Sequence, residues 1–240
     1  MDALEINTVF VITLLGHEVP ITETVVVSWA VMLVLIVFSF IFTRRLKERP
    51  SGFQAVMETG VEFLYGFAEK QFGYLAKFLA PYMGTLFLFL LLANIVGVLS
   101  PVEISFFGLE FKPPFVIRPP TRDINVTGAL AAITILLVPV CGIAAKGFLG
   151  WLKHFIYPLP AMLPFNIMDY GTRLASLSLR LFGNILGGVI MMRMIEGAIP
   201  LAVPMVFSLY FDFFDGLMQA FIFVFLTSLY ISEVVSDHNE

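Results

Sequence analysis

Polar side chains that could carry an ion are concentrated in the last third of this 240-residue chain, inside two apolar stretches. The first stretch, 165–195, carries a series spaced by steps of four, three, four and four: Asp169, Arg173, Ser176, Arg180 and Asn184. The second stretch, 201–235, carries a similar series: Ser208, Asp212, Asp215 and Gln219, with Tyr230 and Glu233 further along. An α-helix has about 3.6 residues per turn, so each series occupies one helical face. Two polar faces in an apolar background predict a water-lined path for a small ion.

Arg180 is the most informative of these residues. A charge at the centre of a membrane helix costs roughly 2.5–3.5 kcal/mol on insertion scales, so it indicates a functional site by default. Arg180 has no acidic residue three or four positions away, and a guanidinium pKa above about 12 keeps it charged. We therefore expect its acidic partner to be Asp212, Asp215 or a carboxylate of another protein chain.

Structural explanations stay open for several of the other polar residues. Asp169 and Arg173, four positions apart, could form only a local ion pair. Asp212 and Asp215 could instead cap a helix or pair with a neighbouring subunit. Small residues at 183, 187 and 188, all glycine, leave room on the first helix for another helix to come close.

The composition restricts the class of protein. Hydrophobic residues make up 59% of the chain and charged residues only 13%, against about 45–50% and 25% in soluble domains. This indicates an integral membrane protein rather than a disordered chain, a nucleic-acid binder or a soluble enzyme. Acidic residues outnumber basic ones, 18 to 14, so no cationic field attracts nucleic acid. The single cysteine, Cys141, excludes an internal disulfide framework and a Cys-rich metal site.

Five stretches are long and apolar enough to cross a bilayer, which takes about 20 residues: 25–42, 83–99, 124–145, 165–195 and 201–235. A sixth stretch, 53–72, is amphipathic and is expected to lie at the cytoplasmic interface or on neighbouring protein. We expect one all-α integral membrane domain over 1–240. A basic cluster at 44–49 places the first loop on the cytoplasmic side. The proline-rich segment 100–123 predicts an external loop with a hairpin at 106–111.

Three motifs resemble one known family. The residues at 176–184 read SLSLRLFGN and resemble the signature of subunit a of the F-type ATP synthase. The residues at 219–223 read QAFIF and resemble the second motif of that family. The residues at 119–125 read PPTRDIN and resemble the start of its middle helix in many bacterial, cyanobacterial and chloroplast members. The resemblance covers nearly the whole chain, including the order of the spans.

The resemblance implies a stationary ion-channel subunit of an ATP synthase. Its last two helices would be long and tilted against the rotating c-ring, with one half-channel open to each side of the membrane. Arg180 would face the c-ring carboxylate, Asn184 and Ser176 would lie beside it, and Gln219 would match the glutamine of the last helix. The candidate ion-translocation residues are therefore Arg180, Asn184, Ser176, Gln219, Asp212, Asp215, Asp169 and Glu233.

The resemblance also implies partners and a location. The partners would be the c-ring, b-type peripheral stalk subunits and the lipid bilayer, in a bacterial plasma membrane or, as an alternative, a thylakoid membrane. The subunit would not be an enzyme by itself and would bind no cofactor, metal, nucleotide or nucleic acid. The chain has no G-x-x-x-x-G-K-[ST] loop for a nucleotide phosphate.

One departure from the family pattern concerns the ionisable group of the external half-channel. Many members carry a glutamate nine residues after the arginine, where this chain has Val189. Asp212 occupies a position where some members carry histidine or glutamate. We interpret this as a carboxylate moved from one helix to the facing one, and Asp215 is the other candidate for that role.

Three other functions are alternatives to this one. A sodium-translocating version of the same subunit stays open, because the choice of ion lies mainly in the c-ring. A stand-alone secondary transporter usually shows paired repeats and interrupted helices in both halves, whereas the ionisable residues here crowd into the last third. An intramembrane hydrolase needs a nucleophile–base pair or a metal motif; the histidines lie outside the predicted spans and no H-E-x-x-H occurs.

Overall fold

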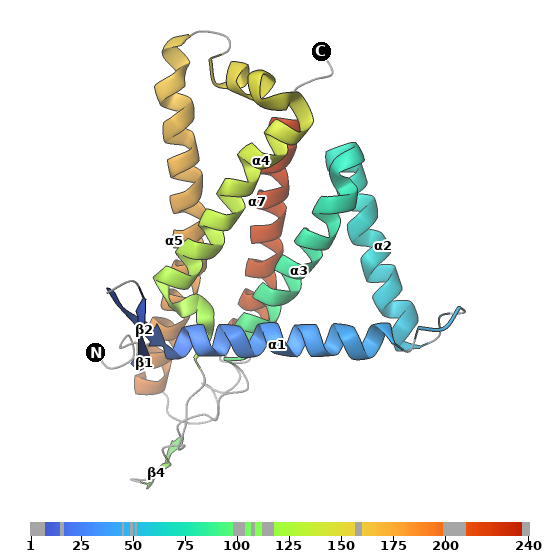
Figure 1. Cartoon of the computed structure of the whole chain (residues 1–240). Helices are drawn as coiled ribbons and strands as arrows, with labels where there is room; N and C mark the ends of the chain where they lie inside the picture. The colour runs from blue at the N-terminus through green and yellow to red at the C-terminus, as the bar shows by residue number, and fades with distance from the viewer. Residues whose placement is uncertain are drawn as a thin grey trace. The chain divides into compact units, whose positions relative to one another are not determined.

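The computed structural model describes residues 8–14, 17–44, 46–48, 50, 52–97, 104–106, 109–111, 118–156, 160–198 and 210–236. Within these residues, five helical segments are long and apolar enough to cross a membrane: Glu23–Thr43, Phe53–Ile95, Ile124–Leu152, Leu163–Met192 and Phe213–Val235. The elements follow one another along the chain as Figure 1 shows. The chain is therefore mainly helical, and the expectation of an all-α integral membrane protein is confirmed.

The amino-terminal third holds a hairpin and three helices. Strands β1 (Thr8–Leu14) and β2 (His17–Thr22) pair antiparallel and lead directly into α1 (Glu23–Thr43). Helix α2 (Phe53–Phe72) coincides with the predicted amphipathic stretch 53–72, and a short 3-10 turn, η2 (Gly73–Leu75), joins it to α3 (Ala76–Ile95). Helix α3 begins ahead of the predicted span 83–99, because buried apolar residues such as Leu79 extend its packing toward the amino terminus.

The middle of the chain contains a second hairpin and a kinked helix. Strands β3 (Ile104–Phe106) and β4 (Leu109–Phe111) pair antiparallel, where the sequence predicts a hairpin. The 3-10 turn η3 (Pro120–Arg122) precedes α4 (Ile124–Ile156). Gly147 interrupts α4 with φ 73° and ψ 165°, a backbone conformation that glycine adopts readily because it has no Cβ. The predicted span 124–145 ends just before this kink.

The last third contains the two helices with the polar faces. After the 3-10 turn η4 (Pro160–Met162), helix α5 runs over Leu163–Ala198 and includes the predicted stretch 165–195. The described part of the last helix consists of a π-helical turn, η5 (Tyr210–Asp215), followed by α7 (Gly216–Ser236). Residues 201–209 of the predicted stretch 201–235 lie outside the described residues.

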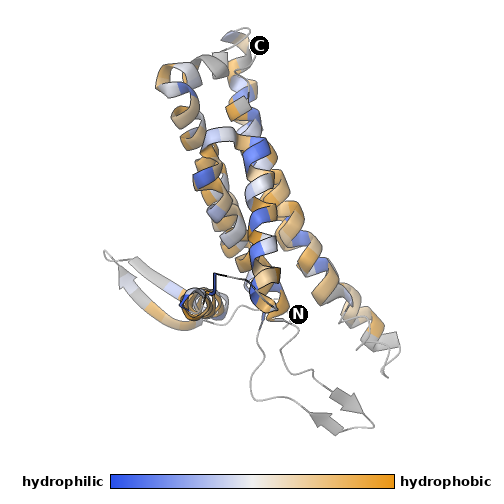
Figure 2. Cartoon of the chain, turned by 90° about the vertical axis from the view of Figure 1, so that its right-hand side faces the viewer, coloured by the Kyte–Doolittle hydropathy of each residue, from blue (hydrophilic) through white to orange (hydrophobic). Residues whose placement is uncertain are grey.

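The chain divides into two compact units, whose boundaries cut through the long helices. The first unit contains 1–37, 89–127 and 179–219, and the second contains 38–88, 128–178 and 220–240. In the first unit the apolar core includes Leu90, Ala93 and Leu181; in the second it includes Phe72, Val138 and Phe223. Many apolar side chains remain exposed, and Figure 2 shows helices that are mostly apolar (orange) with scattered hydrophilic residues (blue). Such exposed apolar surface suits a chain surrounded by lipid.

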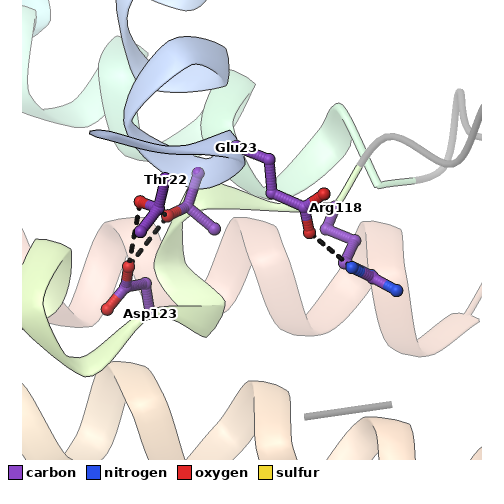
Figure 3. A network of polar contacts seen from close by, with 5 residues as sticks. Thr22, Glu23, Arg118 and Asp123 are labelled. Atoms are coloured by element: carbon purple, nitrogen blue, oxygen red, sulfur yellow. Dashed lines mark hydrogen bonds and ion pairs between the residues drawn. The ribbon is translucent and has the colours of Figure 1, made fainter. Parts of the chain in front are cut away.

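A polar cluster fixes the start of α1 within the first unit. The hydroxyl of Thr24 donates a 2.8 Å hydrogen bond to Oδ2 of Asp123, and the hydroxyl of Thr22 lies 3.5 Å from the same oxygen (Figure 3). Glu23 and Arg118 form an ion pair of 2.5 Å. Asp123 also accepts a 2.9 Å hydrogen bond from the backbone N–H of Asn125, at the start of α4. Because Asp123 is buried, these donors supply the partners that a buried carboxylate requires.

Candidate functional site

The predicted polar face of α5 falls into two groups, because the unit boundary lies between Ser178 and Leu179. Arg180 and Asn184 belong to the first unit, together with Asp212, Asp215 and Gln219 of the last helix. The remaining candidates belong to the second unit: Asp169, Ser176 and Glu233.

Arg180 is a half-buried cation without a partner in the described part of the chain. It forms no hydrogen bond and no ion pair with any described residue. Of its expected partners, Asp215 is half-buried and interacts with other groups, and the side chain of Asp212 lies outside the described residues. A guanidinium carries five N–H donors and a permanent charge, so Arg180 keeps its full capacity to bind an anionic group.

An amide pair joins α5 to the last helix in the first unit. Nδ2 of Asn184 donates a hydrogen bond to Oε1 of Gln219. Asn184 is exposed, whereas Gln219 is only 2% exposed. The other end of the Gln219 amide, Nε2, is buried and has no acceptor among the described residues. Two of the predicted site residues are therefore brought together, and one of them retains an unused donor.

Three glycine positions of α5 near Arg180 have open space beside them among the described residues. A Cβ atom built on Gly183, Gly187 or Gly188 would meet nothing within 4 Å among the described residues. Val189, where the family pattern has a glutamate, is half-buried in the same stretch. Small residues on a membrane helix allow another helix to approach closely, so this stretch of α5 can accept a neighbouring chain.

Arg173 in the second unit contacts two carboxylates and an aromatic ring. Its guanidinium lies 2.6 Å from a carboxylate oxygen of Asp169, and 2.7 and 2.9 Å from the two oxygens of Glu233. The guanidinium also lies over the ring of Tyr230, 4.7 Å from its centroid. The sequence left open whether Asp169 and Arg173 form a structural pair, and the structure contains that pair. We call these four residues the Arg173 cluster; Ser176, the remaining candidate of this unit, is exposed on α5.

Exposure differs within the Arg173 cluster. The Arg173 side chain is 15% exposed, whereas those of Asp169 and Glu233 are 49% and 54% exposed. The partners of Arg173 thus cover most of its side chain, while about half of each carboxylate side chain stays exposed at the surface of the chain. A bidentate pairing of this kind is stronger than a neutral hydrogen bond and fixes orientation.

Sequence reasoning missed a buried polar contact in the first unit. Asn94 of α3 accepts a hydrogen bond of 2.6 Å from Thr121 and donates one of 3.4 Å to the backbone carbonyl of Gly216. The only available signal was that Asn94 is the one strongly polar residue of its predicted span. Its partners are 27 and 122 positions away, which no local pattern could indicate.

The chain matches the family model described as ATP synthase A chain over residues 25–232. The chain belongs to this family. Among its curated relatives, ATP synthase subunit a of Moorella thermoacetica is 36% identical over 220 residues, which cover 92% of this chain and 94% of the relative. The sodium ion specific ATP synthase subunit a of Propionigenium modestum is 35% identical over 222 residues, covering 91% of this chain and 75% of the relative.

These matches confirm the resemblance that the sequence motifs indicated. The chain is a membrane-sector subunit of an ATP synthase and a multi-pass membrane protein. Across the described ranges, no group of three or more His, Cys, Asp or Glu side chains is placed to hold a metal ion.

Proposed function

We propose that the chain is the stationary ion-channel subunit of its ATP synthase, which delivers protons to and from a c-ring carboxylate through two half-channels. The observation that carries the proposal is Arg180. A half-buried arginine in a membrane helix, with no partner among the described residues, is a binding site for an anionic group of another chain. The open glycine positions on the same helix allow that chain to come close.

Arg180 acts by electrostatics. A fixed cation beside a carboxylate favours its ionised form, so the c-ring carboxylate releases its proton when it reaches Arg180. It takes up another proton from the second half-channel before it returns to lipid. Because a bare carboxylate is expensive in hydrocarbon, the ring turns mainly with its carboxylates protonated. The permanent charge of Arg180 also blocks direct ion leakage between the half-channels.

The membrane potential supplies the driving energy. One elementary charge moved through 100 mV is worth about 2.3 kcal/mol, and this energy accumulates over successive protons. Rotation then transmits it to the catalytic sector of the complex. The chain itself makes and breaks no covalent bond of a substrate in this scheme.

The other polar residues supply the half-channels. Asn184, Gln219 and Ser176 provide polar positions on the two helices around Arg180. The basic cluster at 44–49 predicts a cytoplasmic first loop, and from there the order of the spans makes α5 run outward and the last helix run inward. Asp212 and Asp215 then fall toward the external end of the last helix. Asp169 and Glu233 fall toward the cytoplasmic ends of their helices, where the exposed carboxylates of the Arg173 cluster can exchange protons with water.

The partners follow from this role. The chain would contact the c-ring along α5 and the last helix, and b-type peripheral stalk subunits would hold it stationary. The location would be a bacterial plasma membrane. The translocated ion is a proton in this proposal, and sodium is the alternative, since one relative is sodium ion specific.

Ion-pumping by the whole complex in inverted membrane vesicles tests the proposal. ATP-driven acidification that is independent of sodium, and is abolished by a c-ring carboxylate inhibitor, is the expected result. Sodium uptake in place of acidification would select the alternative ion. The purified chain in lipid vesicles without a c-ring is the matched control: substrate transport by the chain alone would support a secondary transporter and contradict the proposal.

A further inference from the structure

Asn94 is a buried amide whose two ends contact two different segments of the first unit. Its side chain lies in α3, and the residue is 6% exposed. The hydroxyl of Thr121 in η3 donates to Oδ1 at 2.6 Å, and Nδ2 donates to the carbonyl oxygen of Gly216 at 3.4 Å. A backbone carbonyl can only accept, so the contact with Gly216 determines which end of the amide carries the nitrogen. Both ends of the amide are therefore satisfied.

Gly216 and Asn94 fit closely. A Cβ atom on residue 216 would lie 2.8 Å from Cβ of Asn94, a distance that two Cβ atoms do not adopt without movement of the backbone. The glycine is buried. Its missing side chain is therefore what allows Asn94 to reach the backbone of the last helix.

The contact lies at the junction of two kinds of helix. Gly216 is the first residue of α7 and directly follows the π-helical turn η5, which contains Asp212 and Asp215. Single π-helical turns often occur at functional sites, and their i→i+5 bonding changes the direction of the side chains that follow. A contact at this junction can therefore determine where the carboxylates of the turn lie.

We propose that Asn94 is a positioning residue for ion transfer. Its amide holds the first residue of α7 against α3 and η3, and thereby fixes the carboxylate-bearing turn η5. In this role Asn94 contacts no ion and acts only through Gly216. The inference rests on the proposed function, in which Asp212 or Asp215 relays protons in the external half-channel.

Two substitutions test this role in the whole ATP synthase complex. Asn94→Leu removes both hydrogen bonds, and Thr121→Val removes only the hydroxyl donor while keeping the shape of the side chain. ATP-driven pumping by inverted vesicles is measured as a function of pH. We expect Asn94→Leu to shift the pH of half-maximal pumping by about half a unit or more, and Thr121→Val to shift it in the same direction by less. The milder variant keeps the test valid if Asn94→Leu fails to assemble.

Leu90→Ala is the matched control, since Leu90 lies in α3 and is fully buried in the same unit. It should lower the amount and thermal stability of assembled complex without moving the pH profile. Equal behaviour of Thr121→Val and Leu90→Ala would overturn the positioning role and leave the proposed function standing. Normal pumping with an unchanged pH profile in both Asp212→Asn and Asp215→Asn would instead show that these carboxylates relay nothing, and both proposals about them would fall.

Discussion

Arg173 and Arg180 are seven positions apart in α5, yet their surroundings are opposite. Arg173 binds two carboxylates and covers an aromatic ring, while Arg180 binds no residue in the described part of the chain. The helical spacing places both arginines on the same polar face of α5, so it does not distinguish them. What separates them is the last helix, which offers Glu233 and Tyr230 to Arg173. An arginine in a membrane helix is therefore classified by its partners rather than by its position on a polar face.

The difference has an energetic meaning. A guanidinium held by bidentate, charge-assisted hydrogen bonds must break them before it can bind another carboxylate. A guanidinium without partners binds and releases a passing carboxylate without that cost. In our proposal Arg173 joins α5 to the last helix, and Arg180 binds and releases the c-ring carboxylates.

Arg180→Ala gives the largest expected effect. Without the fixed cation the ionised form of the c-ring carboxylate is no longer favoured, so the carboxylate keeps its proton. Gradient-driven ATP synthesis and ATP-driven pumping should therefore fall to background. ATP hydrolysis by the detached catalytic sector should persist. Arg180→Lys should also impair coupling, because lysine can lose its proton when desolvated and arginine effectively cannot. A fully coupled alanine variant would refute the assignment of Arg180.

Asp212→Asn comes next, since it removes the carboxylate that would feed protons toward the ring. We expect pumping to fall by about tenfold or more. A positioned acid–base group typically contributes about 100-fold or more to a rate, so a loss of this size is a conservative expectation. Adding Val189→Glu should restore part of the activity, because it returns a carboxylate to the position used by many family members. Normal pumping in the single variant, or no recovery in a normally assembled double variant, would end the idea of a relocated carboxylate.

Gln219→Leu should separate function from stability. The substitution removes the acceptor of the Asn184 hydrogen bond and the unused Nε2 donor. Pumping should therefore fall by about threefold to tenfold, the factor that corresponds to the free energy of one hydrogen bond. Thermal stability should stay level or rise, because Nε2 of Gln219 is buried without a described acceptor and such a group costs about 1–3 kcal/mol. The melting temperature of the assembled complex checks this, and a clear drop with unchanged pumping would contradict it.

Arg173→Met should have the smallest effect on pumping and a measurable one on stability. Pumping should stay within about twofold of the parent, since Arg173 contacts no c-ring carboxylate in our proposal and Asp169 and Glu233 keep their access to water. The free energy of unfolding should fall by about 1–2 kcal/mol, a modest value because the carboxylates of the cluster are half-exposed.

Arg173→Met combined with Asp169→Asn and Glu233→Gln is the control for this prediction. It removes the unpaired charges and should recover much of the lost stability. Complete loss of pumping in Arg173→Met, with normal assembly, would place both arginines in the ion path and remove the contrast between them.

Much of the architecture could be predicted because membrane helices obey strong local rules. Apolar runs of the right length indicated α1, α5 and the described part of the last helix. The start of α3 was less predictable, because Lys77 and Pro81 lower the local hydropathy although the helix continues through them.

Sequence reasoning could predict the contacts of the site within one helix but not those between helices. Helical spacing put Asp169 and Arg173 within reach of one another, and the structure contains their ion pair. The contact of Arg173 with Glu233 depends on how two helices are rotated against each other across 60 positions, and no spacing rule encodes that rotation. The same limit applies to Asn94 and Gly216. The motif at 176–184 made Arg180 stand out.

The polar cluster at the start of α1 has a consequence for the insertion of the chain into the membrane during synthesis. Thr24 and Asp123 are separated by 99 positions, and Glu23 and Arg118 by 95. At a synthesis rate of about 5–20 residues per second, Asp123 leaves the ribosome about 5–20 seconds after Thr24. During that interval α1 must stay in the bilayer by its own hydrophobicity, because Asp123 and Arg118 are not yet available to Thr24 and Glu23. Nascent chains halted before residue 118 should therefore carry an inserted α1 whose amino-terminal end still reacts with water-soluble reagents, and chains halted well after residue 123 should not.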